Sequence, residues 1–285
     1  RLLYIHKRLS MISVNITTTS NRTSLCAATI YSFYNQSIRP DIINLWISRE
    51  PYLSDDGFTE VPKFVEELNM ICDLIKVHFV KNTGPYRKIL PALKEASDDD
   101  VLVYADDDVI YSFKWLEELY NEFIKHNRQY VVASRVRMMK RNFTGNYCSY
   151  SMFPVITENI IMNNDFLITG VGGAVLMKKH IRDEYLTNED YLEIAPKTDD
   201  VWISKILQLS HSSVVTCPRG LSCIMEITHN TDALSYYNNQ LRYNSGLLTK
   251  ITRKLKAFFY RKLGLSLTNN DLSIKKVNKF FKSSL

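Results

Sequence analysis

The chain has 285 residues, of which 45% are hydrophobic and 12% are aromatic. This length and composition suit one large α/β domain with an appendage and exclude a chain that is disordered throughout. The net charge is +6, but residues 247–285 hold ten basic residues and one acidic residue, so the rest of the chain is mildly acidic. A uniformly basic nucleic-acid-binding protein would not show this asymmetry, and we expect no nucleic-acid partner.

Predicted strands and helices alternate from the start of the chain to about residue 133. The strands are short apolar or β-branched runs, as is typical of buried parallel strands, and they cover residues 11–17, 42–47, 75–80, 101–105 and 131–133. The intervening segments have apolar residues at helical spacing. We expect helices after the polar turn at 17–22, over 64–70, over 88–96 with Pro91 in the first turn, and around 115–123.

The alternation loosens after about Tyr150. A glycine-marked apolar piece covers 166–177, and a helix is expected over 200–209. Strands that alternate with helices predict an α/β fold with a mostly parallel, Rossmann-like central sheet flanked by helices. The composition changes near Gly246, so we divide the chain into a domain over 1–246 and a basic amphipathic helical extension over 247–285.

Three aspartates, Asp106, Asp107 and Asp108, directly follow the apolar run 101–105. In an open parallel sheet, ligands bind beyond the carboxyl ends of the strands. Asp106 and Asp108 are two residues apart, so in an extended segment they point to the same side while Asp107 points away. Two such carboxylates suit Mg²⁺ or Mn²⁺, which would neutralise a leaving diphosphate. The alternative is a solvated acidic turn.

Two other segments combine residue types that favour close contact with a ligand. Thr83–Lys88, TGPYRK, lies at a predicted strand-to-helix junction, where backbone N–H groups favour anions and Arg87 and Lys88 add positive charge. Gly170–Gly173, GVGG, permits close approach of the backbone but lacks the spacing of a dinucleotide fingerprint. A solvated basic turn and a bulged strand are the respective alternatives.

The segment VYADDDVIY resembles the DxD segment of GT-A-fold glycosyltransferases, and the chain is similar to family-2-like bacterial glycosyltransferases. Four other pieces follow the order of that family: the opening unit over 13–48, NTGPYRKILPALKEA, TGVGGAVLMKK and PKTDDVWISKIL. Together the pieces span about Met11 to Leu209. The DxD segment alone is weakly specific, whereas five pieces in order indicate the family much more strongly.

The resemblance implies a GT-A fold, a nucleotide-sugar donor that we expect to be UDP-linked, and Mn²⁺ or Mg²⁺ as the cofactor. Asp106 and Asp108 would hold ribose, diphosphate and metal, and we include Asp107 among the nucleotide-sugar-binding residues. Lys88 would meet a phosphate. A late histidine serves as a further metal ligand in some GT-A enzymes, and His229 is the candidate here, although a lone histidine is more often structural.

The resemblance also implies an acceptor side, with a glycan or a lipid-linked molecule as the acceptor in bacterial surface polysaccharide synthesis. Asp200 would be the base of an inverting transfer, taking the proton of the acceptor hydroxyl, and Asp199 would orient the acceptor. A helix cap is the alternative for such carboxylates, especially for Asp199. Gly172, Gly173 and Trp202 would line the sugar or acceptor pocket.

The opening unit departs from the family pattern. The first turn, TTTSNR, lacks the usual proline, and Trp46–Ser48 replaces the acidic pair that often ends the second strand. Thr17, Thr19 and Arg22 are therefore our candidates for binding the nucleotide. Their alternative interpretation is a polar turn that caps the first helix.

The segment Leu247–Gly264, LLTKITRKLKAFFYRKLG, places apolar and aromatic residues near one helical face with Lys and Arg around them. A basic amphipathic helix is typical of a membrane-surface segment, so we expect the tail to contact a membrane. A helix that packs on the body, or on a partner protein, is the alternative.

The five cysteines are odd in number and include no Cys-x-x-Cys pair, which argues against a disulfide framework. The start, RLLYIHKRLSMISVNI, lacks a small-residue cleavage site and is not interpreted as a signal peptide. We expect reduced thiols and a cytoplasmic protein that is peripheral on the inner face of the cell membrane.

Two other functions are compatible with the residues. A nucleotidyltransferase of nucleotide-sugar metabolism also joins an α/β sheet to metal-binding aspartates, but its phosphate loop after the first strand is rich in glycine, and TTTSNRTS has none. A non-catalytic, membrane-associated scaffold with a degenerate nucleotide site is the other alternative.

Overall fold

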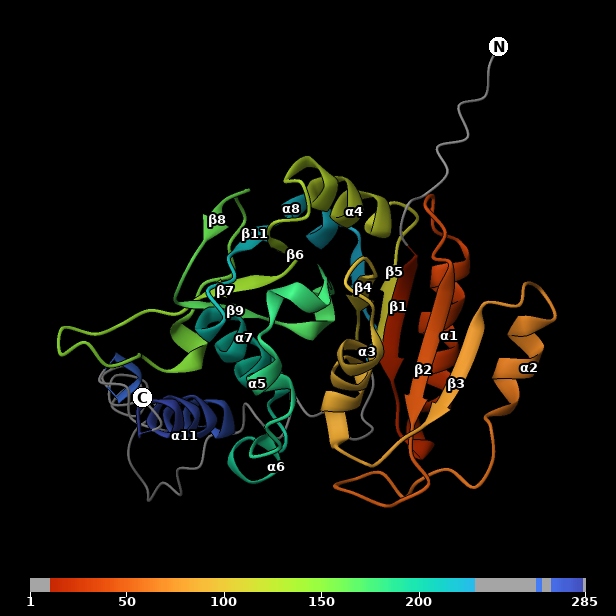
Figure 1. Ribbon diagram of the computed structural model, residues 1–285, viewed down its shortest axis with the longest axis horizontal. Helices are drawn as coiled ribbons and strands as arrows, with labels where there is room; N and C mark the ends of the chain where they lie inside the picture. Colours follow the sequence, from red (N-terminus) through yellow and green to blue (C-terminus); the bar gives the residue numbers. More distant parts are fainter. Residues whose placement is uncertain (1–10, 229–259, 263–267, 284–285) are drawn as a thin grey trace, which may run out of the picture.

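The expected alternation of strands and helices is present in the structure, a computed structural model that describes residues 11–228, 260–262 and 268–283 (Figure 1). The β-branched residues of the first strand are stiff at χ1 and favour an extended backbone. The first half contains β1 (Ile12–Thr17), the 3₁₀ turn η1 (Ser20–Arg22), α1 (Thr23–Tyr34), β2 (Ile42–Ile47), α2 (Lys63–Asn69), β3 (Ile75–Phe79), η2 (Gly84–Lys88), α3 (Leu90–Glu95), β4 (Val101–Tyr104), β5 (Val109–Tyr111) and α4 (Trp115–Lys125).

The second half has shorter elements and more turns. Its elements are β6 (Val131–Ala133), β7 (Val136–Met138), η3 (Tyr150–Met152), β8 (Ile161–Met162), β9 (Phe166–Ile168), η4 (Gly170–Gly172), β10 (Ala174–Leu176), η5 (Lys178–His180), α5 (Asp183–Leu186), α6 (Tyr191–Ile194), α7 (Asp199–Leu209), β11 (Val214–Thr216), α8 (Pro218–Leu221), β12 (Ile224–Glu226) and α11 (Asn269–Ser283).

The main sheet has eight strands in the order β3-β2-β1-β4-β10-β6-β11-β8. The pairs of β1 with β2 and β4, and of β2 with β3, are parallel, whereas β10 runs antiparallel to both of its neighbours. The register sets Asn15 of β1 beside Tyr104 of β4, so the segments that follow these two strands lie side by side. The two small sheets, β12-β5 and β7-β9, were not predicted.

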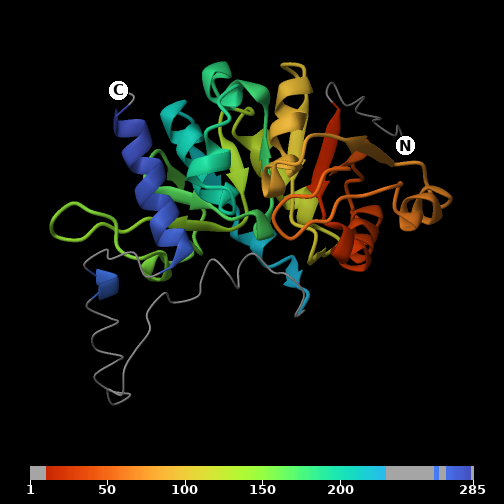
Figure 2. The ribbon, with the colours of Figure 1, turned by 90° about the horizontal axis from the view of Figure 1, so that it is seen from below.

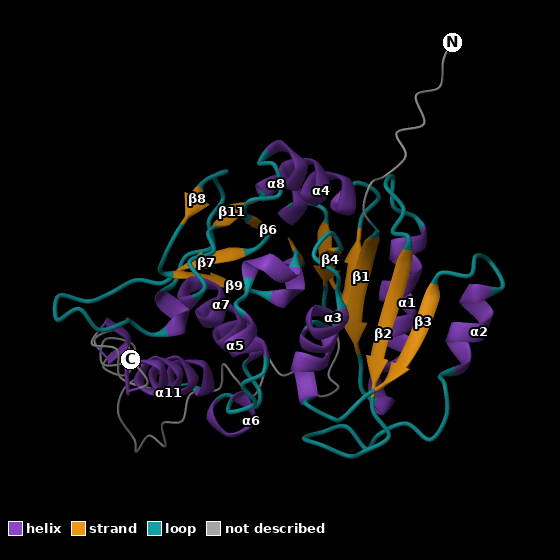
Figure 3. Ribbon diagram, viewed as in Figure 1, coloured by secondary structure: helices purple, strands orange, loops and turns teal. Residues whose placement is uncertain are grey.

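Helices cover both faces of the main sheet and form two hydrophobic cores (Figure 3). Strand β4 shows how the sequence supplies both, because its side chains alternate between the faces. Val101 and Val103 join the core that includes residues of α1 and α4, while Leu102 and Tyr104 join the core that includes residues of α3 and α7. An entirely apolar strand is therefore needed at this position.

The predicted helix over 88–96 is divided in the structure. A 3₁₀ turn ends at Lys88, and α3 begins at Leu90 after Ile89, whose φ of −140° and ψ of −37° are not helical. Pro91 occupies the first turn of α3, as predicted, because the amide that proline lacks has no intrahelical partner there. The division leaves Lys88 at the end of a 3₁₀ turn rather than within a helix.

Helix α11 packs against α7 at the end of the molecule opposite β3 and α2 (Figures 1 and 2). Ile274, Val277 and Phe281 are buried in the core, and the ring of Phe281 lies 5.0 Å from that of Trp202. The predicted boundary at 246/247 and the predicted membrane helix Leu247–Gly264, apart from residues 260–262, lie outside the described residues.

Two chain-wide expectations can be compared with the described residues. All five cysteines are free thiols, in agreement with the expected absence of a disulfide framework. Within the described ranges, none of the helices combines the length and the apolar character needed to cross a bilayer.

We predict that Phe281→Ala will lower the free energy of unfolding by about 3 kcal/mol, because it removes a buried ring from the contact between α11 and α7. Urea unfolding would measure the change. Lys276→Ala on the exposed side of α11 is the control and should alter the same free energy by less than about 0.5 kcal/mol. Equal effects of the two substitutions would contradict the packing.

Candidate functional site

A cavity of about 230 Å³ lies beyond the carboxyl ends of β1 and β4. This is where an open α/β sheet binds ligands. The walls come from loops that are distant in sequence, within the segments 17–22, 52–55, 84–88, 106–108, 169–171 and 197–201, together with Arg135, Tyr150, Glu226 and Asn270. The cavity is therefore lined by the first turn of the opening unit and by the four other pieces whose order resembles that of the family.

The three aspartates after β4 have different partners. Both carboxylate oxygens of Asp107 are engaged, one by Arg22 at 2.6 Å and the other by the hydroxyl of Thr18 at 2.6 Å. Asp108 forms a 2.8 Å ion pair with Arg22. Burial raises the pKa of Asp107 to about 6 against the opposing effect of Arg22. The contacts of Asp107 within the chain favour a structural role, and its predicted contact with the donor stays a prediction.

Lys88 joins two segments of the site. Its Nζ lies 2.6 Å from Oδ1 of Asp106 and 2.7 Å from Oδ2 of Asp199. Burial alone would lower the pKa of Lys88, but Asp106 and Asp199 raise it well above its usual value. The lysine is therefore a permanent cation that connects the aspartates after β4 with the start of α7.

The glycine run is held by side chains that reach its carbonyl oxygens. Tyr111 Oη donates to the Val171 oxygen at 3.2 Å, and Trp115 Nε1 and Ser134 Oγ both donate to the Gly172 oxygen. In this position the Gly170 amide donates to Oδ1 of Asp200 at 2.9 Å. A Cβ on Gly170 would lie 2.5 Å from Lys88 Nζ, so glycine is needed here for the ion pair to form.

Asp200 is half-buried at the first turn of α7. Burial, reinforced by the neighbouring Asp199, raises the pKa of Asp200 to about 8, although Lys88 and the Gly170 amide act in the opposite direction. In its deprotonated form, a carboxylate with this pKa is a stronger base than an ordinary aspartate. Asp199 and Asp200 thus differ in role: one is paired with a lysine, and the other faces the cavity as a potential base.

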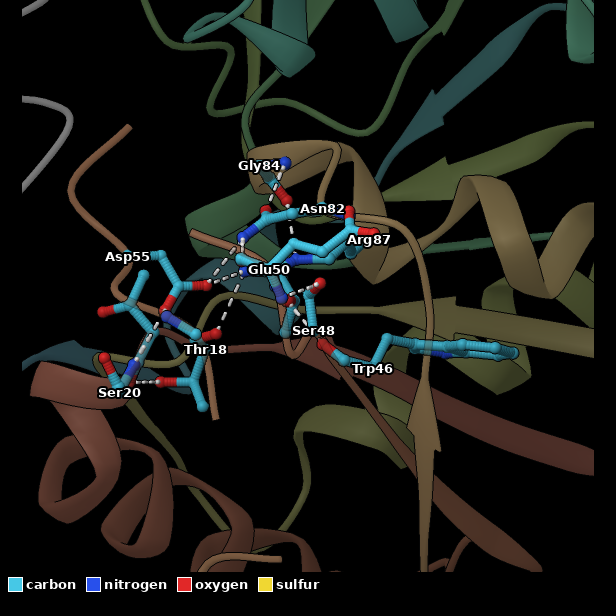
Figure 4. A network of polar contacts seen from close by, with 12 residues as sticks. Thr18, Ser20, Trp46, Ser48, Glu50, Asp55, Asn82, Gly84 and Arg87 are labelled. Carbon is cyan, nitrogen blue, oxygen red and sulfur yellow. Dashed lines mark hydrogen bonds and ion pairs between the residues drawn. The ribbon is translucent and has the colours of Figure 1, made fainter. Parts of the chain in front are cut away.

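A second buried ion pair supports the opposite wall (Figure 4). Asp55 accepts from Arg87 at 2.8 Å and from Asn82 at 3.2 Å, and its other oxygen accepts the Ser20 amide at 3.1 Å. Arg87 also donates to the Thr18 carbonyl at 3.2 Å. Asp55 holds the guanidinium of Arg87 within the cavity wall, and the predicted contact of Arg87 with a diphosphate stays a prediction.

Several predicted site residues lie elsewhere or are already engaged. Trp202 is fully buried among the aromatic side chains of the core and does not line the cavity, since its place on α7 faces α11. Gly172 and Gly173 also lie behind the cavity wall. A Cβ on Gly172 would meet Ser134 and Arg135, and one on Gly173, with φ of +75°, would meet Trp115. These three positions support the pocket instead of lining it.

The three residues of the first turn that are predicted to bind the nucleotide, Thr17, Thr19 and Arg22, line the cavity. Thr17 Oγ1 already donates to the Trp46 carbonyl at 2.6 Å, whereas Thr19 Oγ1 is buried with no hydrogen-bond partner in the described part of the chain. Thr19 is therefore the better candidate of the two for contact with a ligand. Arg22 lies at the end of η1 and faces the aspartates.

The lining residues that the sequence analysis did not single out include Asp55, Arg135, Tyr150 and Asn270. The turn SDDG at 54–57 carried a signal for Asp55, because an Asx turn with glycine suits a loop bend, and Asp55 indeed accepts the Gly57 amide. The other three reach the cavity through long-range packing that has no local pattern.

Two carboxylates of the cavity suit a divalent cation. Asp106 and Asp108 both line the cavity and offer the hard oxygen ligands that Mn²⁺ and Mg²⁺ prefer, with phosphates and water completing such sites. No three His, Cys, Asp or Glu side chains within the described ranges are arranged to hold a metal by themselves. His229, the candidate further ligand, lies outside the described residues.

Comparisons with known proteins identify the family and the fold. The profile of "Glycosyl transferase family 2" matches residues 16–184. The structure of GalNAc-T7 with UDP, GalNAc and Mn²⁺ is similar, with a TM-score of 0.50 and 14% identity over 96% of this chain and 54% of that chain. A structure of residues 1–349 of S. aureus TarS has a TM-score of 0.48 and 17% identity over 72% of this chain and 57% of that chain.

The chain spans little more than half the length of these two structures, and the likeness to GalNAc-T7 shows the fold alone. A search of curated proteins finds no match.

We predict that Gly170→Ala will lower the free energy of unfolding by about 1–3 kcal/mol, because the added methyl group would push Lys88 away from Asp106. Chemical denaturation would measure it. Val171→Ala, which also changes the cavity wall but adds no atom beside Lys88, is the control. A Gly170→Ala protein as stable as the wild type would show that the ion pair tolerates a side chain here.

Proposed function

Because the chain belongs to glycosyl transferase family 2 and has the GT-A fold, we propose that it transfers a sugar from a nucleotide-sugar donor to a hydroxyl group of a glycan or lipid-linked acceptor. The observation that supports this most strongly is the convergence of Asp106, Asp199 and Asp200 on one cavity around Lys88. The cavity thus pairs carboxylates suited to a cation with a carboxylate suited to proton removal.

The donor side would be formed by Asp106, Asp108, Arg22 and Thr19. A bound Mn²⁺ or Mg²⁺ would neutralise the charge of the leaving diphosphate. Arg22, now held by Asp107 and Asp108, would face the diphosphate, and the N-terminus of α1 directly after it favours anions. The ligands of the GalNAc-T7 structure support UDP and Mn²⁺ as first probes.

The acceptor side would use Asp200 as the base. The Gly170 amide fixes one carboxylate oxygen, so the other is left to receive the proton of the attacking hydroxyl. Asp199, held by Lys88, is a positioning residue in this scheme because its ion pair anchors the start of α7. Attack with a single base corresponds to inversion at the anomeric carbon.

The cellular setting follows from the sequence resemblance and the basic tail. We propose a role in bacterial surface polysaccharide synthesis, in the cytoplasm and peripheral on the inner face of the cell membrane. Membership of the glycosyltransferase family leaves the nucleotidyltransferase alternative without support. A non-catalytic scaffold is distinguished by the two measurements below.

We predict that the protein binds UDP in a Mn²⁺-dependent manner and that Asp108→Ala weakens this binding about 100-fold, because it removes a cation ligand. Isothermal titration would measure the dissociation constant. Asp98→Ala, in the exposed acidic turn before β4, is the matched control and should bind as the wild type does. Absence of UDP binding by the wild type would sink the proposal.

We predict that Asp200→Asn will reduce transfer or donor hydrolysis about 10²- to 10⁴-fold while UDP binding is retained. In the wild type the base must be deprotonated, so the rate should rise with pH and level off above about pH 8, following the raised pKa of Asp200. Steady-state rates over a pH series would test both points. Loss of UDP binding in Asp200→Asn would contradict the assignment of a base.

A further inference from the structure

Helix α11 has two faces of opposite character. Its buried side packs Ile274, Val277 and Phe281 on the body. Its solvent side carries the lysine face, which consists of the exposed residues Lys275, Lys276, Lys279 and Lys282. At 3.6 residues per turn, three of these lysines fall within about 60° of each other around the helix axis. The amphipathic pattern of this helix thus turns its charge, not its apolar side, to solvent.

A hairpin over residues 140–148 projects beside this helix (Figures 1 and 2). The Cys148 amide donates to the Lys140 carbonyl at 2.8 Å and closes the hairpin, and Phe143 at its tip is 88% exposed. Lys140 and Arg141 precede this ring and are also exposed. The hairpin therefore presents an aromatic ring at a projecting tip beside two exposed cations.

The base of the hairpin is tied to the start of α11. Ser149 Oγ donates to Asp271 at 3.0 Å, and the Tyr150 amide donates to Asp271 at 2.7 Å. The Ser149 amide also donates to the Arg261 carbonyl at 2.9 Å. The hairpin and the helix are therefore parts of one surface that has a fixed arrangement.

Positive charge is crowded where the two elements meet. Burial lowers the pKa of Lys205 on α7, and the nearby Arg141 and Lys282 lower it further. Asp165 offsets part of this charge through its 2.8 Å ion pair with Arg141. Lys275, Lys276 and Lys282 of the lysine face have no such acidic partner among the ion pairs of the described residues. The surface as a whole thus favours an anionic partner.

We propose that the lysine face of α11 and the Phe143 hairpin together form a docking surface for an anionic lipid membrane. Lysines meet lipid phosphates as hydrated point charges, and an aromatic ring at a projecting tip can enter the headgroup region. This surface is distinct from the membrane helix predicted over Leu247–Gly264.

The docking surface also adjoins the cavity. Tyr150 at the base of the hairpin and Asn270 at the start of α11 both line the cavity that contains Asp200. A protein docked in this way would hold its acceptor side near the membrane surface, which suits a lipid-linked acceptor. This last step rests on the proposed function, whereas membrane binding does not.

The test is co-sedimentation of the full chain, without donor or acceptor, with phosphatidylcholine vesicles that contain or lack an equal part of phosphatidylglycerol. We expect binding only to the anionic vesicles, and binding that weakens as salt is added. Lys275→Glu/Lys279→Glu should weaken binding about 25-fold or more, at about fivefold for each lysine removed. Phe143→Ser should weaken it about 10-fold.

Matched controls lie at the opposite end of the molecule. Lys63→Glu/Lys76→Glu changes the net charge equally on exposed lysines, and Met70→Ser removes an apolar side chain that is 84% exposed. Both should bind vesicles nearly as the wild type does. Circular dichroism of each variant verifies folding.

Three results would overturn the proposal: equal binding to both kinds of vesicle, wild-type binding by the lysine variant, or equal losses in the controls. A wild type that binds duplex DNA but not anionic vesicles would also overturn it. Failure of the transferase proposal would appear separately, as absence of UDP binding in a protein that still sediments with vesicles.

Discussion

Carboxylates buried close together repel one another, and they are retained in a fold only when cations are buried with them. Three segments of this chain bring aspartates into the walls of a single cavity, and three cations are buried with them. Arg87 is paired with Asp55, Arg22 with Asp107 and Asp108, and Lys88 with Asp106 and Asp199. Because each cation connects loops that are distant in sequence, the same pairs that offset the charge also fix the relative positions of the loops.

Lys88 is the central cation among these pairs because its two partners, Asp106 and Asp199, come from two separate segments of the site. Asp106 follows β4 on the proposed donor side, whereas Asp199 opens α7 on the proposed acceptor side. The glycine at position 170 leaves space for the ammonium group, and the amide of the same residue orients Asp200. One residue without a side chain therefore serves both the structural ion pair and the candidate base.

The periodic features of the fold were accessible from the sequence, because apolar strands and helical spacing are local patterns. The order of the motifs also predicted that Lys88, Asp106 and Asp200 share a site, and the structure brings them to one cavity. The resemblance predicts Trp202 in the pocket beside Asp200, but side chains two residues apart on a helix point in different directions, and Trp202 is buried in the core. The contributions of Tyr150 and Asn270 depend on how α11 packs, which no local pattern encodes.

Strand β10 lies in the middle of the sheet, between β4 and β6 and antiparallel to both. Its residues nevertheless come after those of both neighbours in the sequence. Until Ala174–Leu176 is in place, the strands before it form two separate edges of apolar residues with unpaired backbone groups. Such edges are templates for pairing with other chains. A fragment cut between β6 and β10 would therefore be expected to aggregate rather than fold as a smaller domain, even though it contains all three aspartates after β4.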